Sequence, residues 1–199
     1  MSDSVSAVTG VSPASPLAWV ESEGGPLVVV PVSALTAWRG CTLSEDDIVY
    51  DDCDRACAVE DLAGVIAVGA YGAQALVLGD EPAVSCYLPE QRVFLRWLAA
   101  SSDAAIKAGA LGVLAAPDTP WEECGTWVVD GPAVLISAAE AGAALDIRDH
   151  RGRLPDQAPV PLPAGRWRVR AVHAQADRQT WVGLVQLLPG GGSAGGGPS

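Results

Sequence analysis

The chain has 199 residues, of which 49% are hydrophobic and 18% are charged, and this is the composition of a globular protein with enough apolar mass for a core. Its net charge of −12 disfavours binding to nucleic acid or to anionic membranes and favours encounter with a basic partner. The charge is uneven, because residues 1–147 hold 21 acidic and five basic side chains, whereas residues 148–199 hold three acidic side chains and seven Arg.

The two ends of the chain differ from its interior. Residues 1–16 are rich in Ser, Ala, Val and Pro, lack the basic start and apolar centre of a signal peptide, and are expected to be disordered. Residues 190–199 are Gly-rich and predict a flexible tail. We expect a single domain over residues 17–189. Because no apolar run is long enough to span a membrane, we expect a cytoplasmic protein that makes no membrane contact.

Short apolar runs separated by turn residues predict strands along most of the interior. The first runs are 27–30, 62–68 and 73–78, and the four-residue spacer Gly69–Gly72 indicates a hairpin between the second and the third. Runs 84–88 and 92–98 flank Pro89-Glu90 and predict another pair. Runs 127–130 and 133–137 flank a Gly-Pro turn.

Helical signals are few. Residues 102–116 carry a Ser cap, an acid in the first turn and an Ala-rich body that ends at Pro117, so they predict the main helix. Ser33–Arg39 predicts a short second helix. The predicted fold class is therefore α+β and β-dominated, with mostly antiparallel sheet or a sandwich and one main helix near 102–116.

The clearest strand signal is the strict alternation of residues 166–171. It places Trp167, Val169 and Ala171 on one face and three Arg on the other. Residues 176–179 predict a turn, and residues 180–187 return as the partner strand. We expect Trp167 and Trp181 to pack under one sheet face, and the other Trp residues considered to cluster elsewhere: Trp19, Trp38, Trp121 and Trp127. The three Arg are expected to pair with acids on neighbouring strands or to lie exposed.

Catalytic motifs are absent from the predicted domain. Residues 17–189 contain no G-x-S-x-G, H-E-x-x-H, G-x-x-x-x-G-K-[ST] or G-x-G-x-x-G pattern. The formal matches to G-x-S-x-G and G-x-G-x-x-G at 190–195 belong to the low-complexity Gly-rich tail. The two histidines are His150, in a polar loop, and His173, on the apolar side of the alternating strand. Triad partners need not be close in sequence, so a hydrolase with a non-local Cys/His or Ser/His site stays an alternative. The prediction is that the chain is not an enzyme and has no cofactor.

Five cysteines in a chain without a signal peptide do not form a disulfide framework, and we expect free, mostly buried thiols. Cys53 and Cys57 form a C-x-x-x-C pair, which in a helix lies on one face. A zinc site usually brings two short-spaced ligand pairs, and no second pair is present, so no metal site is predicted.

Residues 45–61 are strongly acidic, with Arg55 as the one opposing base. A solvated loop is one interpretation, and a docking surface for a basic protein is the other. Calcium is disfavoured because the spacing is not that of a twelve-residue calcium loop. The predicted partner-binding residues are Glu45, Asp46, Asp47, Asp51, Asp52, Asp54, Glu60 and Asp61.

An ordered set of segments resembles the immunity protein 21 family of bacterial polymorphic-toxin systems. The segments are WVESEGGPL (19–27), YDDCDRAC (50–57), QALVLGDEP (74–82), FLRW (94–97) and LPAGRWRV (162–169). The resemblance spans about Trp19 to Leu188. The sequence departs from the family pattern at Cys53, where an aromatic residue is expected, and in the Gly-rich tail.

The resemblance implies a small cytoplasmic protein whose gene neighbours a toxin gene and which binds and neutralises that toxin. It implies no catalytic residue. An acidic, β-rich body without catalytic motifs agrees with a blocker, since many toxins are nucleases with basic clefts. The expected partner is therefore a cognate protein toxin of basic character. The alternative is a different protein-binding or scaffold role without a toxin.

Overall fold

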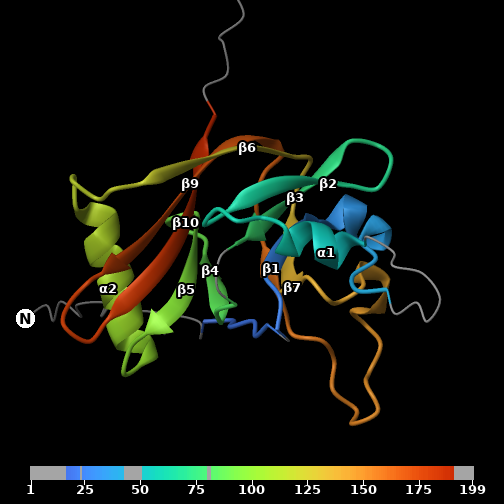
Figure 1. The fold of residues 1–199 in the computed structure, drawn as a ribbon, viewed down its shortest axis with the longest axis horizontal. Helices are drawn as coiled ribbons and strands as arrows, with labels where there is room; N and C mark the ends of the chain where they lie inside the picture. Colours follow the sequence, from blue (N-terminus) through green and yellow to red (C-terminus); the bar gives the residue numbers. More distant parts are fainter. Residues whose placement is uncertain (1–16, 23, 43–50, 80–81, 191–199) are drawn as a thin grey trace, which may run out of the picture.

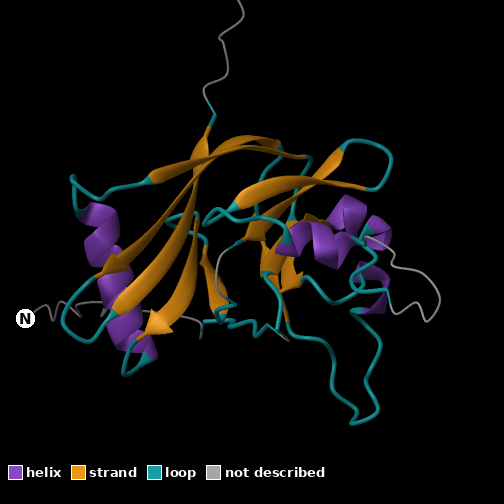
Figure 2. Cartoon of the chain, viewed as in Figure 1, coloured by secondary structure: helices purple, strands orange, loops and turns teal. Residues whose placement is uncertain are grey.

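The computed structural model describes residues 17–22, 24–42, 51–79 and 82–190. Two five-stranded antiparallel sheets face each other, and short helices lie on their outer sides (Figures 1 and 2). This confirms the β-dominated α+β class with one main helix. The expectations for residues 1–16 and 191–199 concern parts of the chain outside the described residues.

The first sheet has the strand order β2-β3-β1-β7-β8. Its central strand β1 is buried along its whole length, because it is covered on both faces. The β2–β3 pair is the hairpin predicted at the Gly69–Gly72 spacer. The bounds are β1 Leu27–Pro31, β2 Gly64–Val68, β3 Ala73–Leu78, β7 Ala133–Ser137 and β8 Gln157–Val160.

The second sheet has the strand order β4-β5-β10-β9-β6. Its two long central strands, β9 and β10, form the hairpin that the alternating C-terminal pattern predicts. The β4–β5 pair around Pro89-Glu90 is also confirmed. The bounds are β4 Ser85–Leu88, β5 Val93–Ala99, β6 Glu122–Val129, β9 Gly165–Gln175 and β10 Trp181–Pro189.

A core of alternating side chains fills the space between the sheets. Leu76, Phe94 and Trp127 are fully buried there, and Trp167 joins them from β9. The indole Nε1 of Trp127 donates to the carbonyl O of Gln74 at 3.0 Å, and this bond joins β6 of one sheet to β3 of the other. The Gln74 side chain adds a second link, since its Oε1 accepts from the N–H of Val128 at 2.8 Å.

Helices cover both outer faces. The 3-10 helix η1 (Val32–Ala37), the short helix α1 (Asp52–Cys57) and the 3-10 turn η2 (Gly142–Ala144) cover the first sheet around buried Trp38. The helix α2 (Asp103–Ala115) packs Ile106 and Ala110 against the second sheet. The Ser102 side chain accepts from the N–H of Ala105 at 3.2 Å, which confirms the predicted cap. The helix expected at Ser33–Arg39 is η1.

Two strands, β8 and β6, show the sequence pattern of a β-strand less clearly than the others. β8 contains Pro159, which cannot donate to a ladder, but β8 lies at a sheet edge where a missing donor is tolerated. The first half of β6 is exposed and does not alternate, and its register shifts between Glu123 and Thr126.

The expectations for the tryptophans are wrong. Trp181 is 43% exposed instead of packing with Trp167, because it pairs with Gln175 at one end of the β9–β10 hairpin, whereas Trp167 pairs with Pro189 at the other end. The other four do not cluster: Trp127 lies between the sheets, Trp38 lies under η1, and Trp19 and Trp121 pack against the outer face of the second sheet.

Two of the three arginines of β9 follow the expectation that they pair with acids or lie exposed, whereas the half-buried Arg170 does neither. Arg168 pairs with Glu123 on β6 at 3.4 Å, and Arg170 donates to the Gln186 side chain and stacks over the Trp121 ring at 4.2 Å. Arg166 is exposed. These contacts hold the outer face of β9 to its two neighbouring strands.

Replacing Trp127 with Ala should lower the free energy of unfolding by about 3 to 5 kcal/mol, because it leaves a cavity between the sheets and removes a hydrogen bond that joins them. The matched control is Val128→Ala on the exposed face of the same strand, expected below about 1 kcal/mol. Urea unfolding measures both. Equal losses for the two variants would show that Trp127 does not join the sheets.

Candidate functional site

The predicted docking residues fall into three groups. Glu45, Asp46 and Asp47 lie outside the described residues. Asp51, Asp52 and Asp54 lie at the start of α1, and Glu60 and Asp61 lie in the loop between α1 and β2. Asp51, Asp52 and Asp54 therefore lie together in the first turn of α1. Glu60 and Asp61 follow the other end of that helix.

Asp51 is the residue at which α1 begins. One of its carboxylate oxygens accepts from the N–H of Asp54 at 2.9 Å, and the other accepts from the N–H of Thr42. The Asp54 carboxylate accepts in turn from the N–H of Asp51 at 3.2 Å, and the two bonds form a capping box. Partial burial raises the pKa of the Asp51 carboxyl, but these hydrogen bonds outweigh it and hold the pKa below its usual value.

Asp52 is buried, and it connects α1 to the rest of the molecule. Its carboxylate accepts from the N–H of Arg39 at 2.7 Å and forms an ion pair with Arg55. The Arg55 guanidinium also donates to the carbonyl O of Ala67 in β2 at 3.0 Å. The Asp52 charge is thus neutralised inside the chain, and it holds the segment before α1 and the strand after it together.

Asp54, Glu60 and Asp61 are exposed. Asp54 also caps the helix, whereas Glu60 and Asp61 have no ion pair with any described residue. Glu60 and Asp61 are therefore the described acids of this segment whose charge can be removed without removing a helix cap or an ion pair.

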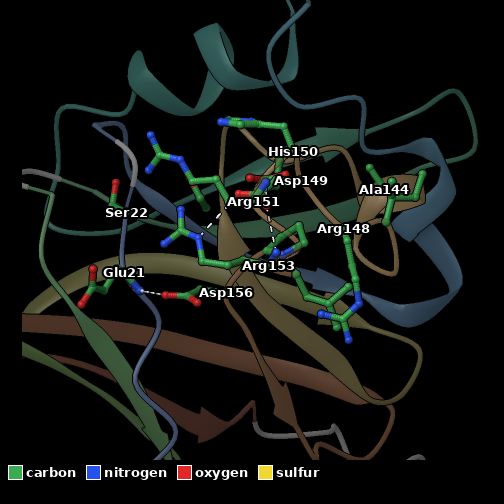
Figure 3. Close-up of a pocket in the computed structure, with 14 residues that line it drawn as sticks. Glu21, Ser22, Ala144, Arg148, Asp149, His150, Arg151, Arg153 and Asp156 are labelled. Carbon is green, nitrogen blue, oxygen red and sulfur yellow. Dashed lines mark hydrogen bonds and ion pairs between the residues drawn. The ribbon is translucent and has the colours of Figure 1, made fainter.

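A second polar site lies on the loop that follows η2. Residues 146–156, termed here the arginine loop, form one wall of a pocket of about 630 Å³, and the segment at Glu21 and Ser22 forms the facing wall (Figure 3). The guanidinium groups around the pocket belong to Arg148, Arg151 and Arg153. The carboxylates belong to Glu21, Glu140, Asp149 and Asp156.

The arginine loop is held by its own polar groups. The Asp149 carboxylate accepts from the N–H groups of Arg151 and Arg153, both at 2.8 Å, and pairs with the Arg153 side chain. These bonds keep the pKa of Asp149 below its usual value. The Asp156 carboxylate accepts from the N–H of Glu21 at 3.4 Å and thereby joins the two walls.

The arginine loop also exposes two large aliphatic side chains, Ile147 at 63% and Leu154 at 42%. Aliphatic and Arg side chains together are typical of protein interfaces. The mixed signs of charge in the pocket suit a polar peptide surface better than a single small ion.

The arginine loop and the acidic segment are attached to the same layer of the fold. Leu145, just before the loop, packs in the same buried cluster as Ala56 of α1. The N–H of Cys41 donates to the carbonyl O of Ala139 at 3.0 Å, and the N–H of Gly142 donates to Trp38 O at 3.0 Å. In Figure 1 both regions lie at the end of the molecule that carries α1.

The sequence left open a hydrolase with a non-local Cys/His or Ser/His site, and the surroundings of the two histidines bear on it. The pocket that His150 lines has no cysteine among its lining residues. Its two serines serve the backbone, since Ser22 Oγ donates to Gly25 O and Ser137 Oγ accepts from the N–H of Ala139. His173 lies on β9 against Gly183 of β10 and is not among the lining residues of that pocket.

All five cysteines are free thiols, and Cys41 and Cys57 are exposed, so the expectation of mostly buried thiols is wrong.

Two further properties of the described residues bear on function. Among them no group of three or more His, Cys, Asp or Glu side chains is arranged to hold a metal ion. No helix in the described ranges combines the length and apolar character needed to cross a membrane.

A family model described as Immunity protein 21 matches residues 18–180, which is most of the chain. The chain belongs to the immunity protein 21 family. No curated protein and no solved structure matches it. The resemblance drawn from the ordered segments is thereby confirmed, and both the acidic segment and the arginine loop lie inside the matched range.

Sequence reasoning did not single out the arginine loop of this immunity protein 21 member. The available signal was the change of charge after residue 147, where Arg148, Arg151 and Arg153 follow a strongly acidic region. That change was read as a property of the whole C-terminal part, because spacing alone does not show that the three Arg line one pocket.

The Asp51 cap should make stability depend on pH. Asp51→Ala should cost about 1 kcal/mol, whereas Asp51→Asn keeps an acceptor and should cost less. Because the folded pKa of Asp51 is lowered, its charge stabilises the fold above the unfolded pKa of about 4, and this stabilisation is lost as the pH falls through the folded value. The free energy of unfolding in urea should differ between wild type and Asp51→Asn at about pH 6, and the two should agree at about pH 2. A gap of equal size at both would rule out a charge effect.

Proposed function

We propose that this immunity protein 21 member binds a cognate bacterial toxin and neutralises it by occlusion, without turning over a substrate. Membership of the immunity family is the observation that carries the proposal. The polar groups around the arginine loop support it, because Ser22 Oγ donates to a backbone carbonyl and the Asp149 carboxylate accepts from backbone N–H groups of its own loop, so these groups shape the surface. Protection of the producing cell places the encounter in the cytoplasm.

The docking surface we propose is the acidic segment, with Asp54, Glu60 and Asp61 as its exposed described members and Glu45, Asp46 and Asp47 as further candidates. Asp51 and Asp52 contribute differently, because their hydrogen bonds fix the start of α1. An acidic surface favours a basic toxin, and a nuclease is the class we favour, since its cleft is built to bind phosphates.

The arginine loop provides a second contact at the same end of the molecule. Its exposed Ile147 and Leu154 supply apolar area, and its Arg side chains suit carboxylates on the partner. On this proposal charge governs the rate of encounter, and the apolar contact governs how long the complex lasts.

Co-expression with the toxin encoded beside its gene tests the function directly. The wild-type chain should rescue growth and should co-purify with the toxin as a complex. The toxin expressed alone is the control for arrest, and an unrelated acidic protein is the control for rescue. Continued arrest in the presence of well-folded chain, without a complex, would contradict the proposed function.

The docking surface is tested by removing charge from the two acids that have no structural role in the described contacts. The double variant Glu60→Gln/Asp61→Asn should slow association with the toxin several-fold at low salt, and the difference should shrink at high salt. The matched control is Glu90→Gln/Asp118→Asn, which removes the same charge from exposed positions elsewhere. Stopped-flow or surface-binding kinetics measure the rates. Equal slowing by both variants would indicate net charge rather than this surface.

A further inference from the structure

One aromatic side chain stands apart from the others among the described residues. Tyr71 lies in the loop between β2 and β3 and is 100% exposed, whereas the next most exposed aromatic residue, Trp181, is 43% exposed. No hydrogen bond, ion pair or ring contact joins Tyr71 to another described residue. The fold therefore makes no use of this ring.

The turn that carries Tyr71 requires glycine but does not require tyrosine. β2 and β3 pair as far as Val68 and Ala73, so residues 69–72 connect them. Gly69 and Gly72 have φ angles of +60° and +78°, in the left-handed region that favours glycine. Small or polar residues usually occupy such a turn. An aromatic ring at its tip is therefore not explained by the local backbone.

The hairpin below the tip is firmly held. Val68 at the end of β2 and Val77 in β3 are buried in the cluster around Trp38. Gly69 lies against η1, since a Cβ placed on it would be 3.1 Å from the Cβ of Ala37. Tyr71 is thus presented on a preorganised base, and little backbone freedom is lost when it binds a partner.

The tip adjoins the acidic segment. Arg55 of α1 donates to the carbonyl O of Ala67 at 3.0 Å. Four residues separate Ala67 from Tyr71, so their Cα atoms are at most about 14 Å apart. In Figure 1 the loop between β2 and β3 lies at the end of the molecule that carries α1 and η1. One partner can therefore contact the ring and the exposed acids together.

The hairpin carries no charge. Residues 62–79 contain no Asp, Glu, Lys or Arg, although the chain has a net charge of −12. Removing a charged side chain from water is costly, and burial of this tip against a partner removes none from the hairpin itself. The tip is therefore the part of this acidic surface that enters a cleft at least cost.

We infer that Tyr71 is the aromatic anchor of the toxin interface, and that its ring enters a cleft lined by Lys and Arg side chains of a basic toxin. This inference rests on the proposed function. Tyrosine is enriched among residues that dominate binding energy, since it brings a large contact area with only two side-chain torsions. A cation in the cleft stacks on the face of the ring, and a donor there bonds the hydroxyl oxygen.

Binding kinetics with the toxin encoded beside the gene test the anchor. Tyr71→Ala should raise the Kd about 30-fold or more, mainly through faster dissociation. Tyr71→Phe keeps the ring and should stay within about fivefold of wild type. The matched control is Trp181→Ala, which removes an exposed aromatic ring from β10 and should leave the Kd unchanged. The urea midpoint of Tyr71→Ala should equal that of wild type, because the ring makes no contact within the described chain.

Chemical modification reads the same contact without a substitution. Tetranitromethane nitrates exposed tyrosines, and peptide mass spectrometry reports Tyr71 separately from the buried Tyr87. Tyr71 should be nitrated readily in the free chain and slowly in the toxin complex. Slow nitration in the free chain would show that the chain itself covers the ring, and it would overturn the inference.

The outcomes separate this inference from the function on which it rests. If the wild type binds the toxin and Tyr71→Ala binds with the same Kd and dissociation rate, the anchor is overturned and occlusion stands. Equal losses of affinity for Tyr71→Ala and Trp181→Ala would also overturn it, because the effect would not be specific to the tip. If the wild type binds no toxin, the proposed function fails and the anchor fails with it.

Discussion

The arrangement of the whole molecule depends on sheets that are apolar on both faces. In β1 every residue is buried, with Leu27 and Val29 facing the second sheet and Val28 and Val30 facing outward. Water cannot cover such an outer face at low cost, so a further layer has to lie on it. η1, α1 and η2 form that layer around Trp38, and α2 does the same for the second sheet.

This covering layer explains where the polar sites are. α1 has only six residues, and a helix of that length gains little from its own hydrogen bonds. Its stability comes from Cys53 and Ala56 on its buried face, which pack into the cluster around Trp38, and from the Asp51–Asp54 capping box at its start. Part of the acidic charge is therefore explained by folding, and only the exposed remainder is available to a partner. The same layer ends in the arginine loop, so charges of opposite sign meet at one end of the molecule.

Most of the fold could be predicted from local patterns. The alternation at Trp167, Val169 and Ala171 gave the correct buried face, and Ser102 marked the correct start of the main helix. The features that were not predicted depend on where a strand lies in its sheet, and the sequence of one strand does not show this. Pro159 is compatible with a strand only because β8 is an edge strand, and Trp181 is exposed because it lies at the opposite end of the β9–β10 hairpin from Trp167.

The candidate site was predictable in part for a related reason. Acidic composition located the segment around α1, but it cannot separate a carboxylate that caps a helix from one that faces solvent. Asp52 and Asp61 look alike in sequence, yet Asp52 is buried against Arg55 and Asp61 is exposed. The three Arg of the arginine loop are visible in the sequence, and only the fold shows that they line one pocket.

The distribution of charge favours binding over turnover for a physical reason. A catalytic site needs a few polar groups held apart from water with shifted proton affinities, as in a nucleophile beside its base. Here the charged side chains of the arginine loop are exposed, and the lowered pKa of Asp149 follows from bonds that shape its loop. The buried thiol of Cys53 has its pKa raised, which suppresses rather than promotes its reactivity. Groups arranged in this way stabilise a shaped, charged surface, which agrees with the binding function proposed above.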